Sequence, residues 1–460
     1  MVLKQGILLS TFPPEGMKHP EAHLNYAFDG DFDIFSHQVA RNETSEEDRT
    51  LYVGFIANNP SNKKVHIQIL SGASYLSQPD APFLPVPDLC LDNEGKIFSG
   101  PGDRVNQDVM RGRRAKFLPD KISLAPGQTK LMFCLPVPVR HLQPALNGRN
   151  TLIKLRSSAP VYIASVARFI GPESKAELAP KEWLEALENF PLASPRDEAP
   201  TPLRFSGSIK YGRVAGVARG TAWNGTLTNK DIESEVADLN MTRNADKHRN
   251  NNNNNKDKDK DKDKEQDTNK NKDKPLPQDA ALNRAPIAVA RNLSSTVLDI
   301  APEGKSITYP FCTVEGGTFG TGQVQSAPMI VRYHDTAYEA HGNYGVTYKI
   351  AMPLHNPFNK IMNVQILFQS SLKSEDHKEQ MCFYETPPAK AFFRGSVYLS
   401  DGTKGNYWHL VEHQGSEGTK LAEISLPAGA KQDYYFEFLY PADSTPPQEL
   451  CIKTLPDTAN

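Results

Sequence analysis

Hydrophobic and polar residues alternate with a period of two along much of this 460-residue chain, which is the pattern of β-strands that bury one face. The clearest example is LYVGFIANNPSNKKVHIQIL, residues 51–70, where two alternating runs flank the turn residues Asn-Pro-Ser-Asn. We interpret this stretch as a β-hairpin. A second stretch, YKIAMPLHNPFNKIMNVQIL at residues 348–367, repeats the turn and both apolar patterns in the same register without a gap.

The similarity extends beyond these two stretches. The further matching blocks are AHLNYAF with AHGNYGV, MRGRR with FRGSV (which pairs Arg111 with Arg394), and ISLAPGQTK with ISLPAGAKQ. Because the blocks recur in one order, we predict an internal duplication of a β unit. If both copies bury equivalent side chains, Ile67 and Val364 should occupy equivalent interior positions.

Each copy contains six to eight short apolar runs separated by Gly, Pro and Asn turns, which is typical of an antiparallel β-sandwich. We therefore predict an all-β protein with two related antiparallel β-sandwich domains. The first sandwich would span residues 1–170 and the second residues 324–460. A β-rich connecting region, residues 171–323, would lie between them.

Two segments of the connecting region differ from the strand pattern. One short helix is predicted near residues 180–190, because Pro180 precedes an apolar stripe that includes Trp183 and Leu187. Residues 244–279 consist mainly of Asn, Lys and Asp and have almost no apolar side chains to bury. We expect this segment to be a disordered, low-complexity loop.

Composition narrows the range of partners. The formal net charge is -2, so no basic excess indicates a nucleic-acid partner. No run approaches the roughly 20 apolar residues that a membrane-spanning helix needs. The five cysteines are odd in number and contain no C-x-x-C pair, which favours neither a disulfide framework nor a zinc site.

The motifs that could carry chemistry do not have the required context. HLVEH, residues 409–413, has the spacing of an inverted zinc-peptidase motif, which functions only on a helix. Its alternating surroundings indicate a strand, on which the two histidines would lie about 13 Å apart, too far to share one zinc ion. GGTFGTG, residues 316–322, is followed by a strand instead of the helix that a phosphate loop requires. We predict no catalytic residues, no metal site and no cofactor.

Two sets of residues remain as candidate binding sites. The duplicated His-x-Asn-Tyr motif could hold a sugar by stacking and hydrogen bonds, or it could serve the packing of a turn. The second set is arginine-rich and could meet carboxylates or sulfates, or form internal ion pairs on a solvated face. The candidate residues are His23, Asn25, Tyr26, His341, Asn343, Tyr344, Arg104, Arg111, Arg113 and Arg114.

The blocks GILLSTFPPEG, YLSQPDAPF, GPGDRV, RGRR, YGRVAGV, GTGQVQSAPM and DTAYEAHGNYGV together resemble a cyanobacterial family catalogued as domain of unknown function 3370. The resemblance covers nearly the whole chain apart from the Asn/Lys/Asp-rich insertion. It implies export, because members of that family generally carry a signal peptide. This chain starts without one, so we expect a truncated or late-assigned start, and a cytoplasmic protein if this start is the natural one.

We hypothesise a non-catalytic protein of the periplasm or cell envelope that binds a glycan or an envelope protein. Two alternatives stay open. A carbohydrate-active enzyme on a β-sandwich scaffold would need two facing carboxylates about 5 to 10 Å apart. A structural assembly protein of the cell surface would need a large exposed apolar patch. The sequence leaves the oligomeric state undetermined.

Overall fold

β-strands dominate the computed structural model, which describes residues 1–174, 178–202, 209–229, 296–315, 317–319, 321–372 and 381–457. These residues form two α-helices, α1 (Pro101–Met110) and α2 (Pro180–Asn189), and one 3-10 turn, η1 (Pro20–Ala22). The predicted all-β class and the helix predicted near residues 180–190 are confirmed. Neither described helix is long and apolar enough to span a bilayer. The insertion predicted at 244–279 lies outside the described residues.

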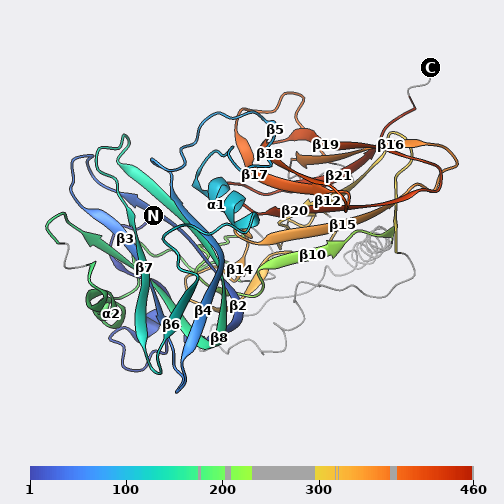
Figure 1. The fold of residues 1–460 in the computed structure, drawn as a ribbon. Helices are drawn as coiled ribbons and strands as arrows, with labels where there is room; N and C mark the ends of the chain where they lie inside the picture. The colour runs from blue at the N-terminus through green and yellow to red at the C-terminus, as the bar shows by residue number, and fades with distance from the viewer. Residues whose placement is uncertain are drawn as a thin grey trace, which may run out of the picture.

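The first sandwich is one sheet folded onto itself (Figure 1). Its long strand β8 pairs with β2 and β4 along its first half and with β1 and β3 along its second half, so the two layers share one strand. Ile67, Phe133 and Ile153 contribute to the core between the layers. The strands are β1 (Gly6–Ser10), β2 (Phe28–Arg41), β3 (Thr50–Asn58), β4 (Val65–Leu76), β6 (Lys121–Leu124), β7 (Thr129–Val137) and β8 (Leu146–Ile170).

Helix α2 covers the outer face of the β1, β3, β7 and β8 layer. Its Trp183 is fully buried and lies directly over Gly54 of β3, where any side chain would overlap the indole ring. The apolar stripe predicted from the sequence is therefore the packing face of this helix.

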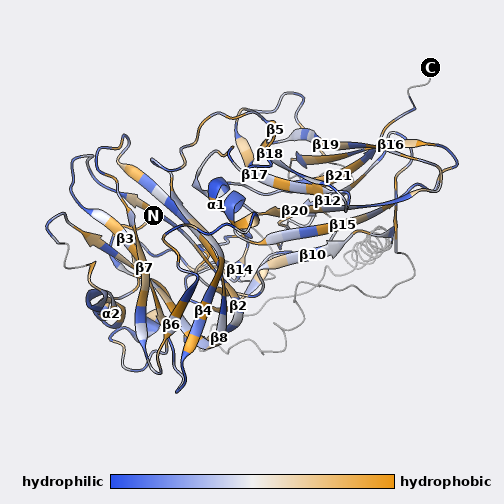
Figure 2. Cartoon of the chain, viewed as in Figure 1, coloured by the Kyte–Doolittle hydropathy of each residue, from blue (hydrophilic) through white to orange (hydrophobic). Residues whose placement is uncertain are grey.

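The second sandwich has two separate sheets whose inner faces enclose a core rich in phenylalanine (Figure 1). One sheet has the order β10 (Ala222–Thr226), β15 (Thr347–His355), β20 (Lys431–Leu439), β17 (Ala391–Ser400), β18 (Gly405–His413) and β5 (Leu89–Leu91), with β11 (Leu298–Asp299) also paired to β15. The other has the order β12 (Ser306–Phe311), β21 (Gln448–Thr454), β16 (Met362–Ser370) and β19 (Ser416–Leu426). Hydrophobic and hydrophilic residues alternate along strands such as β4 and β17 (Figure 2). A small third sheet has the order β14 (Glu339–Ala340), β13 (Ala327–Arg332) and β9 (Gly216–Ala218).

The predicted hairpin is wrong, because the two strands on either side of the Asn-Pro turn lie in different layers. β3 and β4 are separated by β8, and β15 and β16 belong to different sheets. Asn59 is fully buried and donates to the carbonyls of Lys63, Leu124 and Ala125. An arch between layers therefore replaces the hairpin.

The second arch uses the same hydrogen bonds. Asn356 donates to the carbonyls of Lys360, Leu426 and Pro427, and its side-chain oxygen accepts from the N–H of Phe358. Ile67 and Val364 are both fully buried on the strands that follow the arches, as predicted. The two sandwiches thus share one local construction, while their origin by duplication stays a prediction.

One predicted correspondence is wrong. Arg111 follows the end of α1, whereas Arg394 lies within strand β17, so the blocks MRGRR and FRGSV are not structurally equivalent. Helix α1 is also a second helix where the sequence predicted only one. Its sequence, PGDRVNQDVM, is mostly polar and therefore looks like a solvent-exposed segment. In the structure, seven of its ten residues are buried.

Helix α1 joins the two sandwiches, since it packs against β4 and β8 of the first and against β17 and β20 of the second (Figure 1). The N–H of Gly102 donates to Asp443 at 2.7 Å, and Asn106 donates to the carbonyl of Leu439 at 2.9 Å. A second joint involves Tyr333, whose hydroxyl accepts from the N–H of Ser10 and donates to the carbonyl of Ala22. Buried polar contacts therefore hold the two sandwiches in a fixed relation.

Sheet membership and position along the chain do not coincide. Strand β5, from the part of the chain that we assigned to the first sandwich, extends the sheet of the second by pairing with β18. Strand β5 and helix α1 precede residue 170 but contact the second sandwich. The domain limits 1–170, 171–323 and 324–460 stay a prediction.

Candidate functional site

The two His-x-Asn-Tyr segments form turns of the same backbone conformation. Asn25 and Asn343 have φ values of 50° and 46°, in the left-handed region that asparagine tolerates better than most residues. In the first copy, His23 is buried with its Nδ1 2.8 Å from Ser10 Oγ, and burial lowers its pKa. Tyr26 packs edge-on against Phe28, and Asn25 is exposed. This copy shapes a turn.

The second copy is also engaged internally. Asn343 is buried and donates to the hydroxyl of Tyr348 at 2.7 Å, and Tyr344 donates to the carbonyl of Ser444 at 3.3 Å. His341 Nε2 lies 2.9 Å from the carbonyl oxygen of Gly212. The structure does not show the two motif copies lining one common groove.

The four candidate arginines contact their own protein. Arg104 lies over the ring of Tyr75, and Arg111 over the ring of Tyr407, each with its guanidinium carbon 4.0 Å from the ring centroid. Arg113 is bonded to Asp108, and Arg114 is paired with Asp120. Arg111 is almost completely buried, whereas Arg113 and Arg114 keep 44% and 35% of their side chains accessible. All four form internal contacts, and their role in binding stays a prediction.

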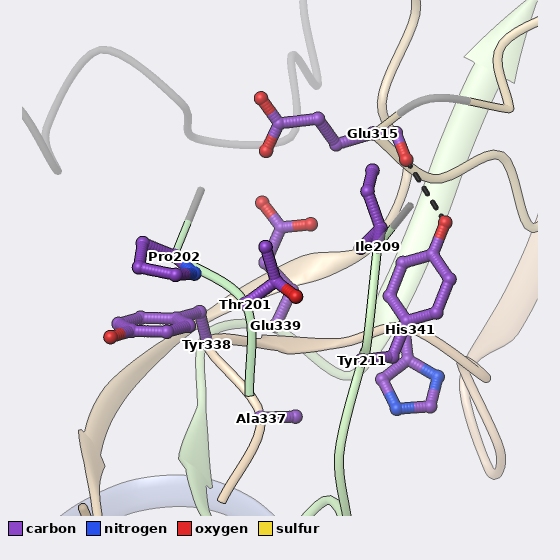
Figure 3. Close-up of a pocket in the computed structure, with 9 residues that line it drawn as sticks. All are labelled: Thr201, Pro202, Ile209, Tyr211, Glu315, Ala337, Tyr338, Glu339 and His341. Carbon is purple, nitrogen blue, oxygen red and sulfur yellow. Dashed lines mark hydrogen bonds between the residues drawn. The ribbon is translucent and has the colours of Figure 1, made fainter. Parts of the chain in front are cut away.

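A pocket beside His341 is too small for an organic ligand (Figure 3). Tyr211 and Tyr338 lie on opposite sides of it, and Glu339 points into the space between them. The cavity volume is about 20 Å³, room for about one water molecule. A second pocket beside Asn343 measures about 10 Å³.

Among the described residues, burial strongly raises the pKa of three carboxyl groups, as is common for catalytic acids, and one of them is Asp443, whose pKa is raised to about 6 where it accepts from Gly102. Burial raises the pKa of Glu412 and that of Glu449 to about 7. Their side chains are 1% and 0% exposed, and the hydroxyls of Ser416 and Ser371 donate to them. A sugar cannot reach carboxyl groups shielded in this way, so these two acids serve the packing of the second sandwich.

A second candidate surface is a sheet face that no described helix covers completely. On the outer face of the second sandwich, the strand registers align side chains in rows that cross five strands. One row contains Asn224, Lys349, Glu437, Tyr398 and Tyr407. The next row contains Thr226, Ala351, Tyr435, Ser400 and Gly405.

Helix α1 determines where this open face begins. It covers the preceding row, in which His409 is fully buried with its Nε2 2.8 Å from Asp103 Oδ2, and Ser396 and Leu439 are also buried. Arg111, directly after the helix, reaches the first open row at Tyr407. Beyond Arg111 the side chains of these rows are exposed or half-buried, with Tyr435 45% exposed.

A family model described as a protein of unknown function, DUF3370, matches residues 1–245 and 285–454. The chain belongs to the DUF3370 family. The match thus spans both sandwiches and leaves out most of the Asn/Lys/Asp-rich insertion of this DUF3370 protein. No curated protein matches the chain.

The tyrosines of the open face were missed in the sequence. Their signal was present, because Tyr398 and Tyr435 occupy the polar phase of strands whose other phase is Val, Leu and Phe. A strand pattern shows that such residues face outward, but it does not show which strands stand side by side.

Proposed function

We propose that this DUF3370 protein is a non-catalytic binding protein of the cell envelope that contacts an extended envelope polymer through the open face of its second sandwich. The observation that carries the proposal is the pair of adjacent rows beyond the edge of α1, which contain the exposed Tyr435 and the half-buried Tyr398 and Tyr407. A flat surface of this kind suits a polymer lying across strands better than a small molecule in a pocket.

The hydrogen-bonded contacts between the two sandwiches support the same proposal. Buried polar contacts of α1 and of Tyr333 fix one sandwich relative to the other. A rigid body loses little conformational freedom when it binds an extended partner, and such preorganisation favours affinity.

A co-sedimentation experiment tests the proposal. Purified full-length protein is mixed with insoluble cellulose, chitin, mannan or peptidoglycan sacculi, and the bound fraction is measured after centrifugation, with a heat-unfolded sample as the control for non-specific adsorption. We expect folded protein to be retained by at least one polymer. Folded protein that stays in the supernatant with all four would overturn the proposal.

The envelope location is a separate part of the proposal. It is supported by the resemblance to exported members of the family. Fractionation of cells that express the natural gene, followed by immunodetection, would place the protein in the periplasmic or envelope fraction if it is correct. Detection in the cytoplasmic fraction alone would contradict it.

A further inference from the structure

Three tyrosines from three adjacent strands lie close together on the open face, and we call Tyr398, Tyr407 and Tyr435 the tyrosine face. Tyr398 of β17 is paired across the sheet with Tyr407 of β18, and their ring centroids are 4.7 Å apart. Tyr435 of β20 is paired with Ser400 of β17, and Ser400 lies two residues after Tyr398 on the same strand. Side chains two residues apart on one strand share a face, so the three rings form one patch.

Glycines hold these rings close to the sheet. A Cβ atom at Gly405 would overlap the ring of Tyr398, so this ring lies across the backbone of its neighbour strand. Gly402, in the turn between β17 and β18, has φ of +84°, and a Cβ there would be 3.4 Å from the Tyr435 ring. Tyr407 is held between Tyr398 and the guanidinium of Arg111. Tyr398 and Tyr407 therefore have little freedom to lose on binding.

Charged and hydrogen-bonding groups alternate with the rings. Glu437 stands between Tyr398 and Lys349 in the same row, and its carboxylate is 3.5 Å from the Lys349 ammonium group. Both groups are partly exposed, with 31% of the Glu437 side chain and 55% of the Lys349 side chain accessible. The surface thus offers flat apolar rings with donors and acceptors beside them.

This composition selects one class of ligand. A phosphate-bearing polymer would meet the carboxylate of Glu437 on a protein whose net charge is -2. An extended peptide that adds a strand would need a free sheet edge, but β17 and β20 each have neighbours on both sides. A neutral sugar needs an aromatic ring for its C–H face and polar groups for its hydroxyls.

We propose that the tyrosine face binds a neutral polysaccharide, with pyranose rings stacked on Tyr435 and Tyr398 and their hydroxyl groups bonded to Glu437 and Lys349. The inference rests on the proposed binding function and names its ligand class and its contact residues. Tyr407, which already lies against Arg111 and Tyr398, supports the neighbouring ring and is a positioning residue.

The experiment compares tyrosines on the tyrosine face with an exposed tyrosine outside it. Tyr384 is 46% exposed, against 45% for Tyr435, and it packs near Gly415, at the opposite end of the β17–β18 pair from Tyr398 and Tyr407. Tyr435→Ala and Tyr398→Ala are titrated calorimetrically with cellohexaose, chitohexaose and mannohexaose, beside wild type and Tyr384→Ala. We expect each face variant to lose roughly tenfold or more in affinity, because each loses one stacked ring. Tyr384→Ala should match wild type.

The conservative variant Tyr435→Trp should retain binding, because it preserves a ring for stacking, and near-ultraviolet circular dichroism verifies that each variant is folded. If wild type and folded Tyr435→Ala and Tyr398→Ala bind one polymer equally well, this inference is wrong while the proposed binding function stands. If wild type binds none of the four insoluble polymers, the proposed function fails first.

Discussion

Glu412 and Glu449 are buried carboxyl groups whose ionised form the protein interior disfavours. Each is almost completely shielded, and within the described residues each is held by serine hydroxyls. Burial in this setting disfavours the ionised carboxylate, which is why both pKa values are raised to about 7. Near neutral pH both carboxyls are about half protonated.

Stability should therefore fall as pH rises between about 4.5 and 7. In that window the unfolded chain releases these two protons while the folded protein retains them, so the free energy of unfolding decreases with pH. Each group contributes up to about 3 kcal/mol of this loss, because burial raises its pKa from 4.5 to about 7. Urea unfolding of wild type, Glu412→Gln and Glu449→Gln at pH 5 and pH 8 measures the effect.

The two glutamine variants should each flatten the pH dependence and be relatively more stable than wild type at pH 8. Glu423→Gln is the matched control, since Glu423 is exposed and its pKa is lowered by Gln365 and Lys420. An unchanged difference between pH 5 and pH 8 in Glu412→Gln would contradict the assignment.

At the scale of elements, the two Asn-Pro arches are the feature that the sequence marked most clearly. Asn59→Ala and Asn356→Ala each remove a buried amide that satisfies three backbone carbonyls. We expect each substitution to lower the free energy of unfolding by about 2 to 3 kcal/mol, measured by urea titration, because three hydrogen bonds from a buried amide are lost at once. The N–H groups of Gln128 and Ala430 still donate to the carbonyls of Ala125 and Pro427 in the two variants. Asn62→Ala, at an exposed position of the first arch, should change it by less than about 0.5 kcal/mol.

The sequence predicted these strands correctly but misassigned the way they connect. Two strands joined by a hairpin and two strands joined by an arch have the same alternation of apolar and polar residues. Only the partner strands with which they pair distinguish the two connections. That partner is β8 for both β3 and β4, and it lies about a hundred residues further along the chain. Helix α1 was missed for a related reason, since its buried polar residues find partners that its own sequence does not reveal. Asn106 donates to the second sandwich and Asp103 contacts His409 there, while Gln107 donates to Asp92 and Ile97 in the segment before the helix.

The same limit applies to the candidate site. His23, Asn343 and Arg111 were selected for their chemical groups, and the structure uses these groups internally. Tyr398 and Tyr435 became candidates only when the registers of β17 and β20 placed them together. Contacts between strands distant in sequence are properties of the tertiary fold, which one sequence does not reveal.

At the scale of the whole molecule, the joint at Tyr333 should couple the unfolding of the two sandwiches. Tyr333→Phe keeps the ring and removes the hydroxyl, which leaves the N–H of Ser10 without its partner. We expect a loss of about 1 to 3 kcal/mol in the free energy of unfolding. Differential scanning calorimetry of wild type should give one cooperative transition, displaced to lower temperature in the variant.

The control is Tyr338→Phe, whose hydroxyl forms no hydrogen bond within the described residues. It should leave the transition in place. Two separate heat-absorption peaks in wild type, only one of which moves in Tyr333→Phe, would show that the sandwiches unfold independently and that the joint does not couple them.

The contact between Asp103 and His409 spans 306 residues of chain. A ribosome adds about 5 to 20 residues per second, so His409 is synthesised roughly 15 to 60 s after Asp103. During that delay α1 and β5 belong to a nascent chain that has no second sandwich to receive them. The surroundings of α1 and β5 are therefore complete only after β17, β18 and β20 have been made.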